Sequence, residues 1–177
     1  KIFHQQPSCP FPRLLATLEH AISRQVHWIN LSLGTTRPSR CSELEQILAR
    51  ATDSGISVVA PAAIGELACY PGALPGCHGV LVDESLVRDE PQQRSHGDDK
   101  VWFASPRPRD LPGLPSAANL SGVSLAAANL TGYVHGFSPN VRDIMDKFGI
   151  EKQIEKLDDK DLLFLVSQKF ARVDLHP

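Results

Sequence analysis

The feature that most constrains the fold is a strand-like segment followed by a helical segment and a second strand-like segment. Residues 26–34 read VHWINLSLG, and apolar residues alternate there with Asn30 and Ser32, as in a strand that buries one face. A helical pattern over 42–54 follows, and 56–62 form a second apolar, strand-like run. Because the connections are short, we expect a right-handed crossover between two parallel strands.

The remaining segments extend this pattern into an α/β domain. Further elements are expected as a helix over 12–24, strands over 78–83 and 101–105, and a helix over 122–134. Residues 84–100 are polar and charged, and we interpret them as an exposed loop or hairpin tip. We therefore predict a parallel sheet flanked by helices.

The helical segment over 42–54 opens with a capping signature. Ser42 is followed three residues later by Glu45, a spacing that predicts a capping box in which both side chains satisfy free backbone N–H groups. Gly55 is the expected end of the helix.

The charge pattern changes after Gly136. The predicted elements before it contain few charged side chains, whereas residues 138–177 are dense in Asp, Glu, Lys and Arg. Apolar residues such as Val141 and Ile144 recur there at helical spacing, which indicates helices with one apolar face. We therefore divide the chain into an α/β domain over 1–137 and a charged helical appendage over 138–177.

The composition is typical of a soluble globular protein and excludes several functions. The 177 residues carry a net charge of −2, which gives no electrostatic case for nucleic acid or an anionic membrane as a partner. No apolar run approaches the roughly 20 residues that span a bilayer. The first residues are too polar after Phe3 for a signal peptide. We therefore expect a cytoplasmic protein.

Neither the cysteines nor the histidines form a recognisable metal site. The spacing of the four cysteines matches neither a zinc site nor a redox C-x-x-C motif. Cys69 and Cys77 could face each other across a loop, but we expect free thiols in an intracellular protein. The seven histidines are scattered, without an H-E-x-x-H pair. We assign no metal and no cofactor. The cysteines are Cys9, Cys41, Cys69 and Cys77.

Residues 119–132 form a stretch of small side chains that read NLSGVSLAAANLTG. We expect a helix here that starts at a ligand-facing loop and then runs into closely packed surroundings. Ser124 lies on its first turn, in the field of backbone N–H groups that lack intrahelical partners. That field suits a nucleophile whose reaction develops negative charge. The alternative is a small-residue helix that only packs closely on the sheet.

Three segments together resemble the subtilisin-like serine proteases. Residues 29–34 read INLSLG, similar to the family's strand that pairs with bound peptide. Residues 55–62 and 70–80 read GISVVAPA and YPGALPGCHGV, similar to its next strand, active-site loop and following strand. Residues 121–132 read SGVSLAAANLTG, similar to the nucleophile motif SGTSMAAPHVAG. The order and rough spacing of the three segments also agree with the family's fold.

The resemblance implies a catalytic and substrate-binding site. Ser124 occupies the position of the nucleophile, and a peptide or protein is the implied substrate. The residues that the resemblance places along the bound peptide, or around the pocket for the residue before the scissile bond, are Ser32, Leu33, Gly34, Pro61, Ala62 and Ala63.

The chain also departs from that family. In that family the catalytic Asp and His lie in D-T/S-G and H-G-T-H segments upstream of the three matching segments. Neither segment occurs before residue 29 in this sequence, and a serine without a base is a very weak nucleophile. The family's oxyanion-binding Asn corresponds to Ile64, or to Glu66 if the loop is longer. Ala128 and Asn129 replace Pro and His in the nucleophile motif, a milder change because those positions pack rather than react. A further chain or segment would have to supply the Asp and His.

Residues 138–177 resemble a helical segment of the methyltransferase subunit of type I restriction–modification systems. They contain neither its glycine-rich cofactor loop nor its N-P-P-F/Y motif, so we carry over neither methylation nor S-adenosylmethionine binding.

Three functions are compatible with these patterns. The first is a subtilisin-like serine peptidase that is incomplete or inactive as this chain alone. The second is a non-catalytic pseudoprotease that binds a peptide or protein. The third is a helical interaction element of a restriction–modification complex, with 138–177 as its docking surface.

Overall fold

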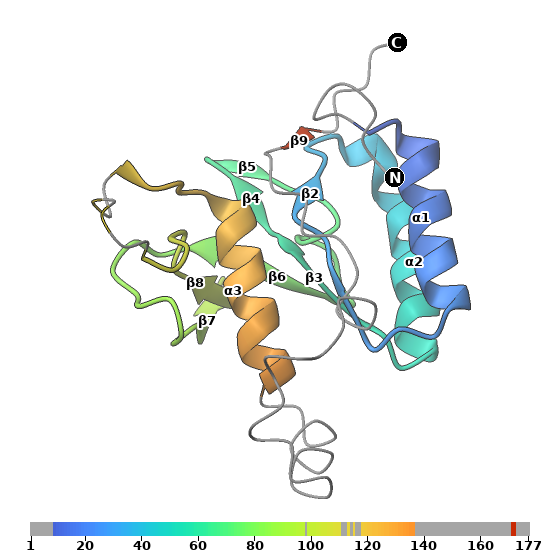
Figure 1. Cartoon of the computed structure of the whole chain (residues 1–177). Helices are drawn as coiled ribbons and strands as arrows, with labels where there is room; N and C mark the ends of the chain where they lie inside the picture. Colours follow the sequence, from blue (N-terminus) through green and yellow to red (C-terminus); the bar gives the residue numbers. More distant parts are fainter. Residues whose placement is uncertain are drawn as a thin grey trace, which may run out of the picture.

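A central sheet and three helices organise the chain (Figure 1). The computed structural model describes residues 9–97, 99–110, 113, 115, 118–136 and 171–172. In chain order the elements are α1 (Phe11–Ser23), β1 (Trp28–Asn30), β2 (Leu33–Gly34), the 3₁₀ helix η1 (Pro38–Arg40), α2 (Cys41–Asp53), β3 (Ser57–Pro61), β4 (Ala63–Ile64), β5 (Leu67–Ala68), β6 (Cys77–Val82), β7 (Gln92–His96), β8 (Asp99–Ala104), α3 (Val123–Gly136) and β9 (Ala171–Arg172).

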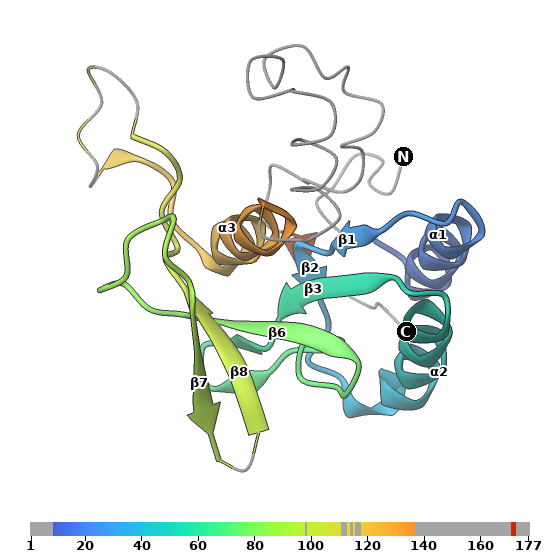
Figure 2. The ribbon, with the colours of Figure 1, turned by 90° about the horizontal axis from the view of Figure 1, so that it is seen from below.

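The main sheet has five strands in the order β1-β3-β6-β8-β7. Strands β1, β3, β6 and β8 run parallel to one another, and β7 pairs antiparallel with β8. Helix α3 covers one face, and α1 with α2 covers the other (Figure 2). The expected α/β architecture, a parallel sheet flanked by helices, is therefore confirmed.

Two apolar clusters follow from the alternation of side chains along the strands. Neighbouring residues of a strand point to opposite faces, so Val58 packs with α1 and α2 whereas Val59 packs under α3. On the helical side of the larger cluster, Leu14 and Leu18 of α1 meet Leu48 of α2. Fully burying a side chain of this size contributes about 1.5–3 kcal/mol. The clusters hold the sheet between its helices and leave its ends open to the loops.

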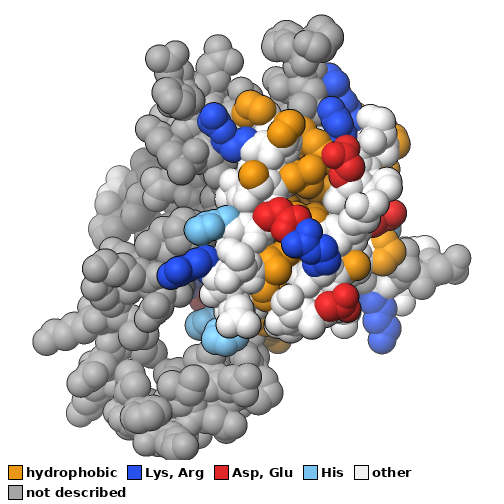
Figure 3. Space-filling view, turned by 90° about the vertical axis from the view of Figure 1, so that its right-hand side faces the viewer, with side chains coloured by type: hydrophobic (Ala, Val, Ile, Leu, Met, Phe, Trp, Pro, Cys, Tyr) orange, Lys and Arg blue, Asp and Glu red, His pale blue; other side chains and the backbone are white. Residues whose placement is uncertain are grey.

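The outer face of α1 and α2 is a mixed, solvated surface. Figure 3 shows acidic and basic side chains interspersed there with apolar ones. An exposed ion pair between Glu19 and Arg50 joins the two helices. Such a pair contributes little to stability, so the buried residues carry the packing.

The strand predicted over 26–34 is divided in two. Strand β1 pairs with β3, and β2 leaves the main sheet after Ser32. Thr35 and Tyr70 then exchange backbone hydrogen bonds of 2.8 Å in each direction. The chain therefore changes partner at the end of β1, which bends it toward the loop that follows β5.

The polar stretch 84–100 contains an edge strand. Strand β7 turns back on β8 through Gly97, which has a φ of +63°, so the hairpin interpretation is confirmed. Every side chain of β7 is exposed. A polar edge of this kind resists pairing with other chains.

The predicted capping box at Ser42 is wrong. The N-cap of α2 is Arg40, and no side chain caps the helix. Because η1 runs directly into α2, which begins at Cys41, Ser42 already lies within the helix and is not in the N-cap position. Instead, Arg40 and Glu43 form an ion pair of 3.1 Å across the first turn.

The helical appendage predicted over 138–177 lies outside the described residues, apart from Ala171 and Arg172. These two form β9, which pairs in parallel with β2.

Candidate active site

The parallel strands bring several loops together at one edge of the sheet. Ser32 comes after β1, Asp83 directly follows β6, and Ser105 directly follows β8. Parallel strands place their carboxyl ends at the same edge, where open α/β sheets bind their ligands. Helix α3 also begins at this edge, because Ser124 contacts Ser32.

Ser124 and Ser32 form a reciprocal pair of hydrogen bonds. The Ser124 Oγ donates to the carbonyl oxygen of Ser32 at 3.3 Å, and the Ser32 Oγ lies 3.2 Å from the carbonyl oxygen of Ser124. Ser32 is buried and Ser124 is half-buried. The pair joins the first turn of α3 to the chain after β1, so two of the predicted site residues lie together.

The first turn of α3 places backbone N–H groups next to Ser124 in the sequence. Leu125 and Ala126 both direct their N–H groups to the carbonyl of Gly122. The N–H groups of Val123 and Ser124 precede any intrahelical acceptor. They lie at the positive end of the helix dipole, which favours an anionic group at this end of α3.

Asn129 fixes the other side of α3. Its Nδ2 donates to the carbonyl oxygens of Ser105 and Arg107, both at 2.9 Å. Gly122 adds a backbone bond of 3.0 Å to Pro106. The expectation that position 129 only packs therefore missed a hydrogen-bonded tie to the loop after β8. The signal that could have indicated it is the amide of Asn129 beside the apolar run from Leu125 to Ala128.

The segment Ser32 to Gly34 is held from behind by the loop that follows β5. The Leu33 side chain is 3% exposed and belongs to the core, so only its backbone can face a ligand. A side chain at Gly34 would overlap Cys69 Sγ and the carbonyl oxygen of Tyr70. The position is therefore restricted to glycine by close packing.

The same loop holds Pro61, Ala62 and Ala63. Pro61 ends β3, and its carbonyl lies against Gly72. Ala62 accepts a hydrogen bond of 2.9 Å from the Cys69 N–H, and Ala63 begins β4. Both predicted substrate-contacting segments therefore pack against residues 69–72. Among the described residues, no hydrogen bond connects the segment 61–63 to Ser124.

The cysteines at this loop are not candidate nucleophiles. Burial raises the pKa of the Cys69 thiol, and that of the Cys77 thiol, to about 12. Both groups are therefore protonated at neutral pH, and the thiolate is the reactive form of cysteine.

None of the described histidines is hydrogen-bonded to Ser124. His135 is in the last turn of α3, roughly 16 Å along the helix from Ser124 at 1.5 Å per residue. His78 lies inside β6 in register with Val59, and its ring is 5.6 Å from that of Trp28. Desolvation by burial lowers the pKa of His78, so it is mainly neutral and structural at neutral pH.

Neither residue at the position of the oxyanion-binding Asn is a substitute for it. Ile64 is half-buried in β4, and Glu66 is exposed in the turn between β4 and β5. Neither side chain carries an amide or hydroxyl donor. The backbone N–H groups at the start of α3 are therefore the main candidate donors to an oxyanion among the described residues.

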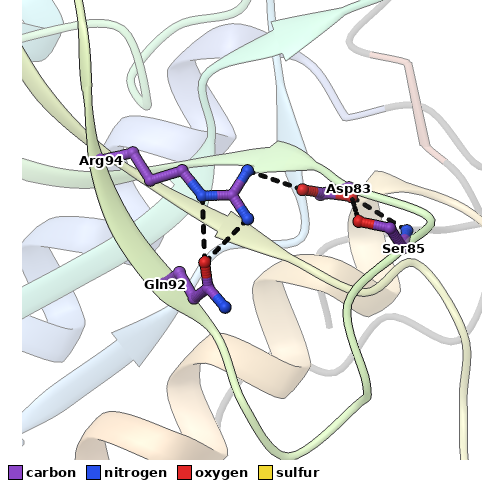
Figure 4. Close-up of polar contacts among 4 residues, drawn as sticks. All are labelled: Asp83, Ser85, Gln92 and Arg94. Atoms are coloured by element: carbon purple, nitrogen blue, oxygen red, sulfur yellow. Dashed lines mark hydrogen bonds and ion pairs between the residues drawn. The ribbon is translucent and has the colours of Figure 1, made fainter.

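The sequence analysis did not identify a further polar cluster, which begins at this edge with Asp83. Asp83 Oδ2 pairs with Arg94 Nη1 at 2.7 Å, and Asp83 Oδ1 accepts from Ser85 (Figure 4). Arg94 also donates to Gln92 and covers the ring of Phe103. Hydrogen bonds from Ser85 and Arg94 hold the pKa of Asp83 below its ordinary value. These groups satisfy one another, so the cluster fixes the β7–β8 hairpin.

Comparison with solved structures identifies the type of fold. The prenylagaramide maturation protease PagA superposes with a TM-score of 0.56 at 18% sequence identity. The chain has a protease-like fold. The match covers 84% of this chain and 55% of PagA, so the chain spans about half the length of that protease. No protein-family model and no curated protein matches the sequence.

Two features are missing from the part of the chain that the structure describes. No helix there is long and apolar enough to cross a membrane. No group of three or more His, Cys, Asp or Glu side chains is arranged to hold a metal ion in that part of the chain.

Proposed function

We propose that the chain forms the nucleophile-bearing part of a subtilisin-like serine peptidase. Ser124 is the nucleophile, and hydrolysis requires an Asp and a His from another segment or chain. The backbone of Ser32 to Gly34 and the segment Pro61 to Ala63 border the bound peptide. On this proposal the chain alone binds peptide and hydrolyses it poorly or not at all.

The observation that carries the proposal is the contact between Ser124 and Ser32. These residues are 92 positions apart in the sequence, and the sequence resemblance assigned both to one site. Their reciprocal hydrogen bonds at the carboxyl edge of a protease-like fold support that assignment. A helix that merely packed on the sheet would not need a serine in contact with this segment.

The chemistry follows from the groups present. The Ser124 Oγ attacks the peptide carbonyl carbon while a base takes its proton, and the same base then protonates the leaving amine. The oxyanion of the tetrahedral intermediate would accept hydrogen bonds at the start of α3, where the Ser124 N–H has no acceptor within the helix. In the resting structure the Ser124 hydroxyl donates to Ser32, so a base must replace that acceptor.

The open edge of the sheet indicates where the base would enter. Among the described residues, β1 is the end strand of the main sheet and pairs only with β3. Its carboxyl end leads within two residues to Ser32 and thus to Ser124. A segment that carries the His could approach Ser124 past this edge without displacing any strand of the main sheet.

A non-catalytic peptide-binding function is the second candidate. It is favoured by the lack of a histidine beside Ser124 among the described residues, and by Ile64 and Glu66 at the position of the oxyanion-binding Asn. The third hypothesis, a helical interaction element over 138–177, rests on the sequence alone.

Chemical rescue with a fluorophosphonate probe tests the proposal on the chain itself. We expect slow labelling of the chain, and labelling faster on the order of tenfold when imidazole is added as an external base, because general base catalysis contributes 10²–10⁴-fold when the base is fixed in place. Ser124→Ala should abolish the labelling. Ser121→Ala, at an exposed serine three residues earlier, is the matched control and should leave it unchanged.

Labelling that persists in Ser124→Ala would refute the assignment of the nucleophile. If imidazole has no effect, but a peptide shifts the NMR amide signals of Ser32 and Gly34, the non-catalytic function replaces the peptidase. Absence of both labelling and peptide-induced shifts contradicts both candidates.

A further inference from the structure

Asn30 places a buried carboxamide behind the Ser124–Ser32 pair. It is the last residue of β1, its exposed fraction is 7%, and it is in register with Val59, which packs under α3. Its Oδ1 lies 3.4 Å from the Ser32 Oγ. Nothing in the sequence resemblance assigned a role to this residue.

The hydrogens at this contact restrict the orientation of the carboxamide. The Ser32 hydroxyl has one hydrogen but two oxygen neighbours, Asn30 Oδ1 at 3.4 Å and the carbonyl oxygen of Ser124 at 3.2 Å. The hydroxyl can therefore donate a well-formed hydrogen bond to only one of these oxygens. The oxygen and nitrogen of an amide are nearly alike in shape, so their assignment follows from the hydrogen-bond network.

Turning the carboxamide so that Nδ2 faces Ser32 resolves the conflict. Asn30 Nδ2 then donates to Ser32 Oγ, and the Ser32 hydroxyl donates to the carbonyl of Ser124. The Ser124 hydroxyl completes the relay by donating to the carbonyl of Ser32. Successive hydrogen bonds of this kind strengthen one another in a buried environment.

We infer that Asn30 is a positioning residue that orients Ser124 through the hydroxyl of Ser32. The inference rests on the proposed function of Ser124 and deepens it. Among the described residues, side-chain hydrogen bonds hold α3 beside β1 through the Asn30–Ser32 relay and beside β8 through Asn129. Of these two, the relay reaches Ser124, so the position of its hydroxyl depends on Asn30.

The isosteric variant Asn30→Asp tests the inference because it removes the donor and keeps the shape. We expect imidazole-assisted labelling of Ser124 to fall about tenfold, the effect of losing one hydrogen bond of ordinary strength. The control Gln93→Glu makes the same amide-to-acid change on exposed β7 and should leave the rate within a factor of two.

An NMR measurement separates this inference from the proposed function. In Ser32→Ala, the Nδ2H₂ signals of Asn30 and the backbone amide of Ser124 should both shift, whether or not the probe labels the chain. Asn30→Asp should shift the Ser124 amide more than Gln93→Glu does. If the Asn30 Nδ2H₂ signals are unchanged in Ser32→Ala, Asn30 does not donate to Ser32 and the inference is wrong, even if labelling of Ser124 succeeds.

Discussion

At the scale of single residues, the site depends on positions where no other side chain fits. Gly34 lies against Cys69 and the backbone of Tyr70, and Gly72 lies against the backbone of Pro61. The sequence indicated a strand through Gly34, because apolar and polar residues alternate there. It could not indicate this packing, because the loop that causes it comes 35 residues later and contacts Gly34 only in the folded chain.

Substituting Gly34 by alanine should destabilise the protein. The added methyl group would overlap Cys69 Sγ and a backbone carbonyl, and overpacking of this kind costs about 1–3 kcal/mol. Urea unfolding monitored by circular dichroism measures the change. Gly132→Ala is the matched control: it lies exposed in α3 with open space around its Cα, so alanine should stabilise by about 0.5–1 kcal/mol. Equal effects at the two positions would contradict the packing described for Gly34.

His78 should make stability depend on pH. Burial lowers its pKa from the ordinary value of 6.5, so the unfolded chain binds the proton more readily than the folded one. The stability that comes from keeping His78 neutral in the folded state is therefore fully present above pH 6.5. It is lost as the pH falls through the folded-state pKa. Unfolding free energies measured between pH 5 and 8 should decline on the acid side by at most about 1.4 kcal/mol per pH unit. A His78→Gln variant that keeps the same slope would show that another group causes it.

At the scale of elements, sequence periodicity correctly predicted those helices and strands whose local preference agrees with their tertiary contacts. Helices α1 and α3 and strands β3 and β8 begin and end within a few residues of their expected bounds, because each shows a clear helical or strand-like pattern. The prediction of a cap at Ser42 failed because η1 leads directly into α2, so the helix begins before Ser42. The contacts Ser124–Ser32 and Asp83–Arg94 join separate elements, so no local pattern could reveal their geometry.

Asn129 should prove to be the principal side-chain tie between α3 and the loop after β8. Asn129→Ala removes two hydrogen bonds of 2.9 Å and leaves two carbonyls without those donors, at a cost of about 1–3 kcal/mol. Hydrogen exchange should become faster at Gly122, whose N–H donates to Pro106 in the same loop, and not in β1. If protection is lost equally across the sheet, the effect is global rather than a local release of the loop.

At the scale of the whole molecule, the sheet gathers residues far apart in sequence at one edge. Fold class followed from the order of strands and helices, whereas the candidate site residues came from the resemblance to the subtilisin-like proteases. Parallel strands place their carboxyl ends together, and Ser32 and Ser124 meet at that edge. Among the described residues the main sheet ends at β1. In the proposed function, Ser124 is a nucleophile whose base comes from another segment or chain.

The central claim is tested most directly by mapping the site of fluorophosphonate labelling in the presence of imidazole. The tryptic peptide 110–142 contains Ser116, Ser121, Ser124 and Ser138, so fragment ions compare four serines in one molecule. We predict that the adduct lies on Ser124 and that imidazole increases it there alone. An adduct spread over all four serines would contradict this prediction, because Ser124 would then have no reactivity beyond that of an ordinary hydroxyl.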